Sequence, residues 1–163
     1  MVFTEGTIIM HCGGIGHTRE EIVKQVEEKE NTIYDLASYV PVGSAVEKLK
    51  TWKNQGAEIL YLTSRARSDE VASIEGILKK YGFPVGQLLF CRENQQYKDV
   101  AERVIPDILI EDDCESIGGI DEMTITHVKA EIRERIKSIP VKEFGGIDHL
   151  PDEITALREY SLI

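Results

Sequence analysis

Two apolar runs that each stop abruptly at polar residues constrain the fold of this chain most. Residues 59–62 precede Thr63-Ser64-Arg65, and residues 108–110 precede Glu111-Asp112-Asp113. This pattern is typical of a strand that is buried on both faces of a parallel sheet and whose carboxyl end opens onto a site. We therefore expect an α/β fold with polar side chains gathered along one edge of its sheet.

Composition limits the architecture and the class of partner. The chain has 163 residues, of which 42% are hydrophobic, so residues 1–163 are expected to form a single domain. The net charge of −10 argues against a nucleic-acid-binding surface. No run approaches the roughly 20 apolar residues of a membrane span, and the first residues lack the pattern of a signal peptide. The three cysteines are odd in number and widely spaced, which indicates free thiols and a cytoplasmic location.

Apolar periodicity and capping residues predict an alternation of strands and helices. Strands are expected at 7–12, 58–62, 88–91, 107–111 and 139–141, and helices at 19–30, 44–54, 69–81, 98–104, 128–137 and 152–159. Such an alternation favours a mostly parallel sheet with helices on both faces. Ligands bind such sheets at the carboxyl ends of the strands, which points to His11, Cys12, Thr63, Ser64, Arg65, Cys91, Asp112 and Asp113.

Several of these residues occur in a familiar order. The set Leu62-Thr63-Ser64-Arg65, then Lys98, then Ile110-Glu111-Asp112-Asp113 resembles motifs two, three and four of the haloacid dehalogenase-like (HAD) superfamily. The segment 80–84 also resembles that family's linker, so the resemblance covers most of residues 44–118. It implies a single Rossmann-like domain with a minimal cap or none. A very small cap insertion is possible at residues 16–42, and it would leave the site fairly open.

The resemblance implies a role for each matching residue. Thr63 would donate a hydrogen bond to a phosphoryl oxygen, with Ser64 and Arg65 beside it, and Lys98 would neutralise charge on the phosphoryl group. Asp112 and Asp113 would hold Mg²⁺. These roles agree with general chemistry, because phosphoryl transfer needs positive charge and hydrogen-bond donors, and Mg²⁺ prefers oxygen ligands.

The first motif of the family is missing. Its Asp-x-Asp, which supplies the nucleophile and the general acid/base, would fall on His11 and Gly13 at the end of the expected first strand. Aligning the following Thr of the family with Thr18 moves the pair to Gly14 and Gly16. Neither alignment supplies an aspartate. We therefore expect no standard aspartyl-phosphate chemistry and only weak Mg²⁺ binding.

Other residues near the expected site leave alternatives open. His11 or Cys12 could act as a substitute nucleophile, although a buried cysteine and a polar strand-end histidine explain them more simply. Gly13 and Gly14 could bind phosphate through backbone N–H groups or form a plain loop, and they do not fit a dinucleotide-binding fingerprint. A zinc site that includes Cys12 and Cys114 is conceivable but lacks a spacing motif.

Two functional hypotheses follow, with a third, plainer alternative. The first is a divergent HAD-like protein without standard phosphatase activity, which binds a phosphorylated small molecule or anion at the strand ends. The second is a metal-dependent phosphohydrolase that uses a non-standard nucleophile or a metal-activated water. The third is a structural partner protein. No nucleic-acid or membrane partner is expected, and a homo-oligomer is possible.

Overall fold

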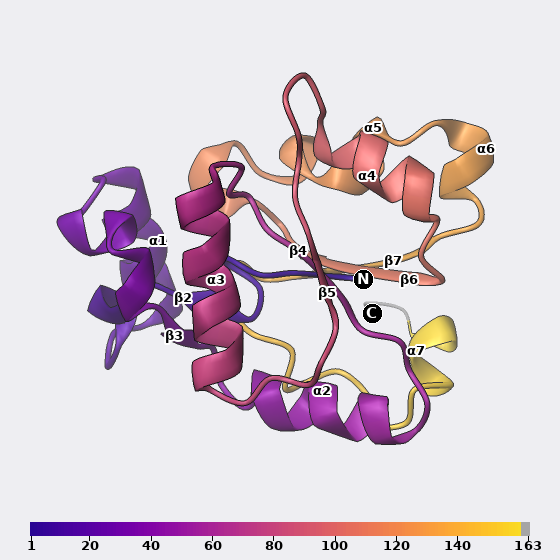
Figure 1. The fold of residues 1–163 in the computed structure, drawn as a ribbon, viewed down its shortest axis with the longest axis horizontal. Coiled ribbons are helices and arrows are strands. Elements are labelled where there is room, and N and C mark those ends of the chain that lie inside the picture. Colours follow the sequence, from indigo (N-terminus) through magenta and orange to yellow (C-terminus); the bar gives the residue numbers. More distant parts are fainter. Residues whose placement is uncertain (161–163) are drawn as a thin grey trace.

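The computed structural model, which describes residues 1–160, is built around a five-stranded sheet (Figure 1). Its order is β5-β4-β1-β6-β7, and every neighbouring pair is parallel. The strands are β1 (Val2–Phe3), β4 (Leu60–Leu62), β5 (Gln87–Leu89), β6 (Ile108–Asp112) and β7 (Lys137–Val141). The chain therefore has a Rossmann-like α/β architecture, as the alternation of elements predicts.

Helices cover both faces of this sheet (Figure 1). One face packs against α2 (Ala45–Asn54), α3 (Ser68–Lys80) and α7 (Ala156–Glu159). The other packs against α4 (Tyr97–Val104), α5 (Thr124–His127) and α6 (Ala130–Arg133). Adjacent strand residues serve opposite faces: Tyr61 joins the core on the α2 side, whereas Leu62 joins the core on the α4 side. This two-sided burial explains the continuous apolar runs.

Between β1 and α2 the chain makes an excursion beyond the carboxyl ends of the strands, at the left of Figure 1. A small antiparallel pair, β2 (Ile9–Met10) and β3 (Val40–Pro41), closes its base. Helix α1 (Arg19–Glu27) lies between them and begins at a capping box formed by Thr18 and Glu21. Short 3₁₀ helices complete the excursion at Cys12–Gly14, Asn31–Tyr34 and Leu36–Ser38.

The prediction of a first sheet strand at 7–12 is wrong. The strand that enters the main sheet is Val2–Phe3, whereas Ile9–Met10 pairs with Val40–Pro41 in a separate two-stranded sheet. Apolarity misled the prediction, because Ile8 and Ile9 are completely buried without belonging to the main sheet. The correction matters for function, since the first strand is followed by Thr4 and Glu5 and therefore does deliver a carboxylate.

Other boundaries differ less. The predicted helix 128–137 is reduced to the short helix α6, with α5 just before it, and β7 already begins at Lys137. The predicted helix 152–159 is only Ala156–Glu159, and residues 116–126 hold two 3₁₀ turns, Glu115–Ile117 and Ile120–Glu122. Across residues 1–160, every helix is too short or too polar to cross a membrane.

Gly86, just before β5, provides a test of the close packing between β5 and β4. A Cβ atom there would lie 2.3 Å from the carbonyl oxygen of Ile59, so Gly86→Ala should lower the free energy of unfolding by about 1–3 kcal/mol. Gly76 in α3 has open space around it, and Gly76→Ala should instead stabilise by about 0.5–1 kcal/mol. Chemical denaturation of both variants is the measurement. Equal effects would contradict this packing.

Candidate functional site

Parallel strands bring polar residues from distant parts of the sequence to one edge of the sheet. These residues and the excursion enclose a pocket of about 220 Å³. The strand ends contribute Glu5, Ser64, Arg65, Asp112 and Glu143 to its lining, and the excursion contributes His11, Val26, Ile33 and Tyr39. The excursion therefore covers the strand ends in part, as a very small cap would.

Glu5 is the centre of a cluster of hydrogen-bond donors. Its Oε1 accepts from Thr63 Oγ1 at 2.7 Å and from Arg65 Nε at 3.2 Å. Its Oε2 accepts from the Ser64 N–H at 3.2 Å and from the Thr4 hydroxyl. The sequence predicts Thr63, Ser64 and Arg65 as ligands of an anion. The structure brings them together around an anion that belongs to the chain itself.

Asp112 lies at the end of β6 and faces the same pocket. Its Oδ2 accepts from Thr7 Oγ1 at 2.9 Å, and its Oδ1 accepts from the Cys114 N–H at 3.1 Å. Gly6 passes so close that a Cβ there would lie 2.8 Å from Oδ2, and its φ of +80° independently favours glycine. Burial raises the pKa of the Asp112 carboxyl.

Asp113 is directed elsewhere, because successive strand residues point to opposite sides. It forms an ion pair with Lys142 at 2.9 Å and accepts from the Glu143 N–H at 3.0 Å. Burial acts to raise its pKa, but the bonds to Lys142 and to the Glu143 N–H outweigh burial and lower it. The two aspartates that the sequence groups together therefore do not converge on one point.

This arrangement does not fit a preassembled magnesium or zinc site. Among residues 1–160, no three His, Cys, Asp or Glu side chains are grouped as metal ligands. Each oxygen of Asp112 already accepts a hydrogen bond from the protein, and Asp113 is paired with Lys142. Cys12, Cys91 and Cys114 are free and half-buried.

Two further carboxylates belong to this region. Glu111 accepts from the N–H groups of Thr124 and Ile125 at 2.8 and 3.1 Å. Glu143 accepts from the N–H and the hydroxyl of Ser116, both at 2.7 Å. Burial raises the pKa of both groups. Sequence reasoning missed Glu5 and Glu143, although Glu143 follows an expected strand and the strand-end rule would have found it.

His11 is brought to the pocket, whereas its neighbours are not. Its side chain is buried, with Nδ1 2.9 Å from Thr32 Oγ1 and the ring edge-on to Phe144. Burial lowers the pKa of His11. The Gly14 N–H donates to the His11 carbonyl and Gln25 donates to the Gly13 carbonyl, so these glycines form a 3₁₀ turn against α1. Cys12, Gly13 and Gly14 do not line the pocket.

Lys98 lies in the first turn of α4 and is half-buried. No hydrogen bond or ion pair joins its side chain to another residue in the range 1–160, and the neighbouring Tyr97 lines the pocket instead. The Tyr97 ring packs edge-on against Phe3 at 5.2 Å, and burial raises its pKa to about 12. The structure thus gives Tyr97 the place at the pocket wall that the sequence assigns to Lys98.

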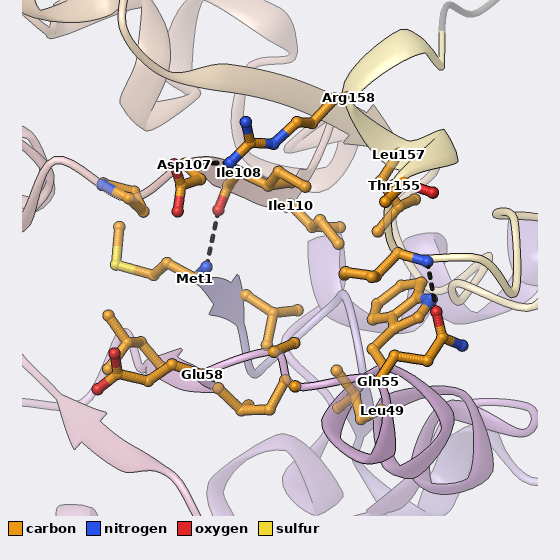
Figure 2. Close-up of a pocket in the computed structure, with 18 of the residues that line it drawn as sticks. Met1, Leu49, Gln55, Glu58, Asp107, Ile108, Ile110, Thr155, Leu157 and Arg158 are labelled. Atoms are coloured by element: carbon orange, nitrogen blue, oxygen red, sulfur yellow. Dashed lines mark hydrogen bonds and ion pairs between the residues drawn. The ribbon is translucent and has the colours of Figure 1, made fainter.

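A larger cavity of about 620 Å³ opens at the opposite edge, among the amino ends of β1 and β6, α2 and α7 (Figure 2). Apolar side chains such as Leu49, Ile110 and Leu157 make up much of its wall. The Met1 amine donates to the Ile108 carbonyl at 2.7 Å, and Arg158 pairs with Asp107 at 3.0 Å (Figure 2). Met1, Asp107 and Arg158 are thus paired within the protein, whereas the buried histidine and the buried carboxylates lie around the smaller pocket.

Comparison of the chain with protein-family models, with curated proteins and with solved structures found no match.

The raised pKa values predict a pH-dependent contribution to stability. A carboxyl whose pKa is higher in the folded state stabilises below its ordinary value of about 4, and this contribution is lost as pH rises through the folded value. Glu143→Gln removes the titration and can keep both bonds to Ser116. The melting temperature of the variant minus that of the wild type should therefore increase between pH 4.5 and 7.5.

His11 and the Met1 amine, whose pKa values are lowered by burial, make stability rise with pH, and the difference between variant and wild type cancels their contribution. Glu115→Gln is the matched control, since Glu115 is an exposed acid that pairs with Arg19. A difference for Glu143→Gln that is constant with pH would show that this carboxyl does not titrate as described.

Proposed function

We propose that this protein is a divergent HAD-like protein that lacks standard phosphatase activity and binds a phosphorylated small molecule or anion at the strand ends. The observation that carries the proposal is the convergence of Thr63, Ser64 and Arg65 on one carboxylate. Together with the Thr4 hydroxyl, they direct two hydroxyls, a backbone N–H and a guanidinium at two oxygens, which forms a site for a tetrahedral or planar oxyanion. The phosphoryl group of a ligand would displace the Glu5 carboxylate from these donors.

The strand order supports the resemblance to the HAD superfamily. The strands before Thr63 and Asp112 flank β1 on either side, so the motif-like segments meet around the end of the first strand. With β1 at Val2–Phe3, the nearest acid to a first motif is Glu5. If Glu5 takes the second position of Asp-x-Asp, the first is Phe3, and if it takes the first position, the second is Thr7.

Neither alignment supplies two carboxylates, so with β1 at Val2–Phe3 the chain still lacks the pair that standard aspartyl-phosphate chemistry requires. Glu5 itself is held by four donors, among them the guanidinium of Arg65. An anion held in this way is a poor nucleophile, because its charge is already neutralised and its oxygens are hydrogen-bonded. The retained donors therefore favour binding over hydrolysis.

The first test is hydrolysis of 4-nitrophenyl phosphate with Mg²⁺, Mn²⁺ or Zn²⁺. We expect the wild type not to exceed the rate of Asp112→Asn with any of the three metals, because residues 1–160 group no three metal ligands and Glu5, held by four donors, is a poor nucleophile. Activity that is lost in Asp112→Asn would instead favour the metal-dependent phosphohydrolase, and His11 and Cys12 would then be the next residues to substitute.

The second test addresses binding directly. Glu5→Gln removes the charge that competes for Arg65, so inorganic phosphate should bind this variant about tenfold more tightly than the wild type, a difference of ~1.4 kcal/mol. Calorimetric titration is the measurement, and thermal denaturation checks that the variant is folded. Glu115→Gln, which removes one of the two acidic partners of Arg19 outside the pocket, should leave the affinity unchanged. A folded Glu5→Gln with no gain in affinity would refute the anion site.

A further inference from the structure

The pocket at the strand ends is lined by three carboxylates that have no basic partner within residues 1–160. They belong to Glu111, Asp112 and Glu143, and we call this part of the pocket the inner wall. Glu111 is 2% exposed, and Asp112 and Glu143 are each 7% exposed. All the hydrogen bonds that their side chains accept come from backbone N–H groups or from the hydroxyls of Thr7 and Ser116. In the part of the chain that the structure describes, none of these three carboxylates pairs with a basic side chain.

The basic side chains nearby are used by other acids. Arg65 pairs with Glu5, Lys142 with Asp113, and Arg19 with Glu115. A buried carboxylate that has only neutral donors around it keeps much of its desolvation cost. A positive group that enters this pocket would therefore be bound more strongly than the same group on an open surface.

His11 provides a second and independent observation that points to a ligand. The residue is 1% exposed and lines the pocket, yet its Nε2 has no hydrogen-bond partner among residues 1–160. When Nδ1–H donates to Thr32 Oγ1, Nε2 is an acceptor and requires an incoming N–H or O–H group. A buried polar atom without a partner is costly, so a ligand that donates a hydrogen to it gains affinity.

The remaining wall is aromatic and apolar. Tyr39, Tyr97 and Phe144 line the pocket together with Val26 and Ile33. Aromatic faces attract ammonium groups, and apolar side chains accommodate the carbon chain that bears such a group. Acceptors, carboxylates and aromatic rings together match an organic cation with several N–H donors.

We propose that the ligand of this pocket carries a protonated primary amine in addition to its phosphoryl group. The inference rests on the proposed function, because a phosphoryl group that displaces Glu5 adds another free carboxylate to the wall. A ligand without positive charge would then meet Glu5, Asp112 and Glu143 with only Arg65 in compensation. The amine would donate to Asp112, Glu143 and His11 Nε2, while the phosphoryl group is held by Thr63, Ser64 and Arg65.

Three matched probes test the inference by calorimetric titration in the presence of a chelator: 3-aminopropyl phosphate, propyl phosphate and propylamine. The first should bind at least about tenfold more tightly than either of the others, since each charge-assisted contact is worth about this much. Glu143→Gln, which can keep its bonds to Ser116, should remove most of the advantage over propyl phosphate. Glu115→Gln is the control that should not change it, and melting curves check the folding of both variants.

The outcomes separate the inference from the function on which it rests. Equal binding of 3-aminopropyl phosphate and propyl phosphate would overturn the amine and leave the phosphate site in place. Equal binding of 3-aminopropyl phosphate and propylamine would overturn the phosphate site and support the amine. If Mg²⁺ gives propyl phosphate the same gain as the amine, a metal supplies the charge and the inference is wrong. No binding of any probe, to the wild type or to Glu5→Gln, would overturn both.

Discussion

The contact between Glu5 and the donors after β4 is the interaction on which the arrangement of the strand ends depends. It joins the turn after β1 to Thr63, Ser64 and Arg65, and so fixes two neighbouring strand ends with one carboxylate. The same turn brings Gly6 against Asp112 and places Thr7 to donate to it. One short segment after a two-residue strand thus determines how β4 and β6 present their polar residues to the pocket.

The sequence predicted most of the fold because the central strands are buried on both faces. The apolar runs at residues 59–62 and 108–110 identify β4 and β6 from the sequence, and the sheet is parallel as expected. The first strand could not be found in the same way. Val2–Phe3 is only two residues long, whereas Ile8 and Ile9 are as apolar as a strand and fully buried outside the main sheet. The sequence indicates that a segment is buried, but it does not indicate which sheet that segment joins.

The candidate site was predicted in part, for reasons that the geometry explains. Thr63, Ser64 and Arg65 converge because they follow a strand directly, so their position needs no knowledge of distant contacts. Asp112 and Asp113 separate because of the two-residue period of a strand, a rule that was available from the sequence. The contacts of Glu5 and His11 depend on how the excursion folds back, and these long-range contacts have no local signal.

Charge balance links the two halves of the pocket. Among the donors that follow β4, the charge of Arg65 is neutralised by Glu5, so the site without a ligand needs no external anion. At the inner wall, Asp112 and Glu143 are stabilised only by neutral donors, and burial raises their pKa values. An anion that takes the place of Glu5 makes the whole pocket more negative, and this penalty grows as water is excluded. Positive charge that enters together with an anionic group would offset this penalty, so under the proposal a ligand that carries both charges binds more tightly than one that carries only the anion.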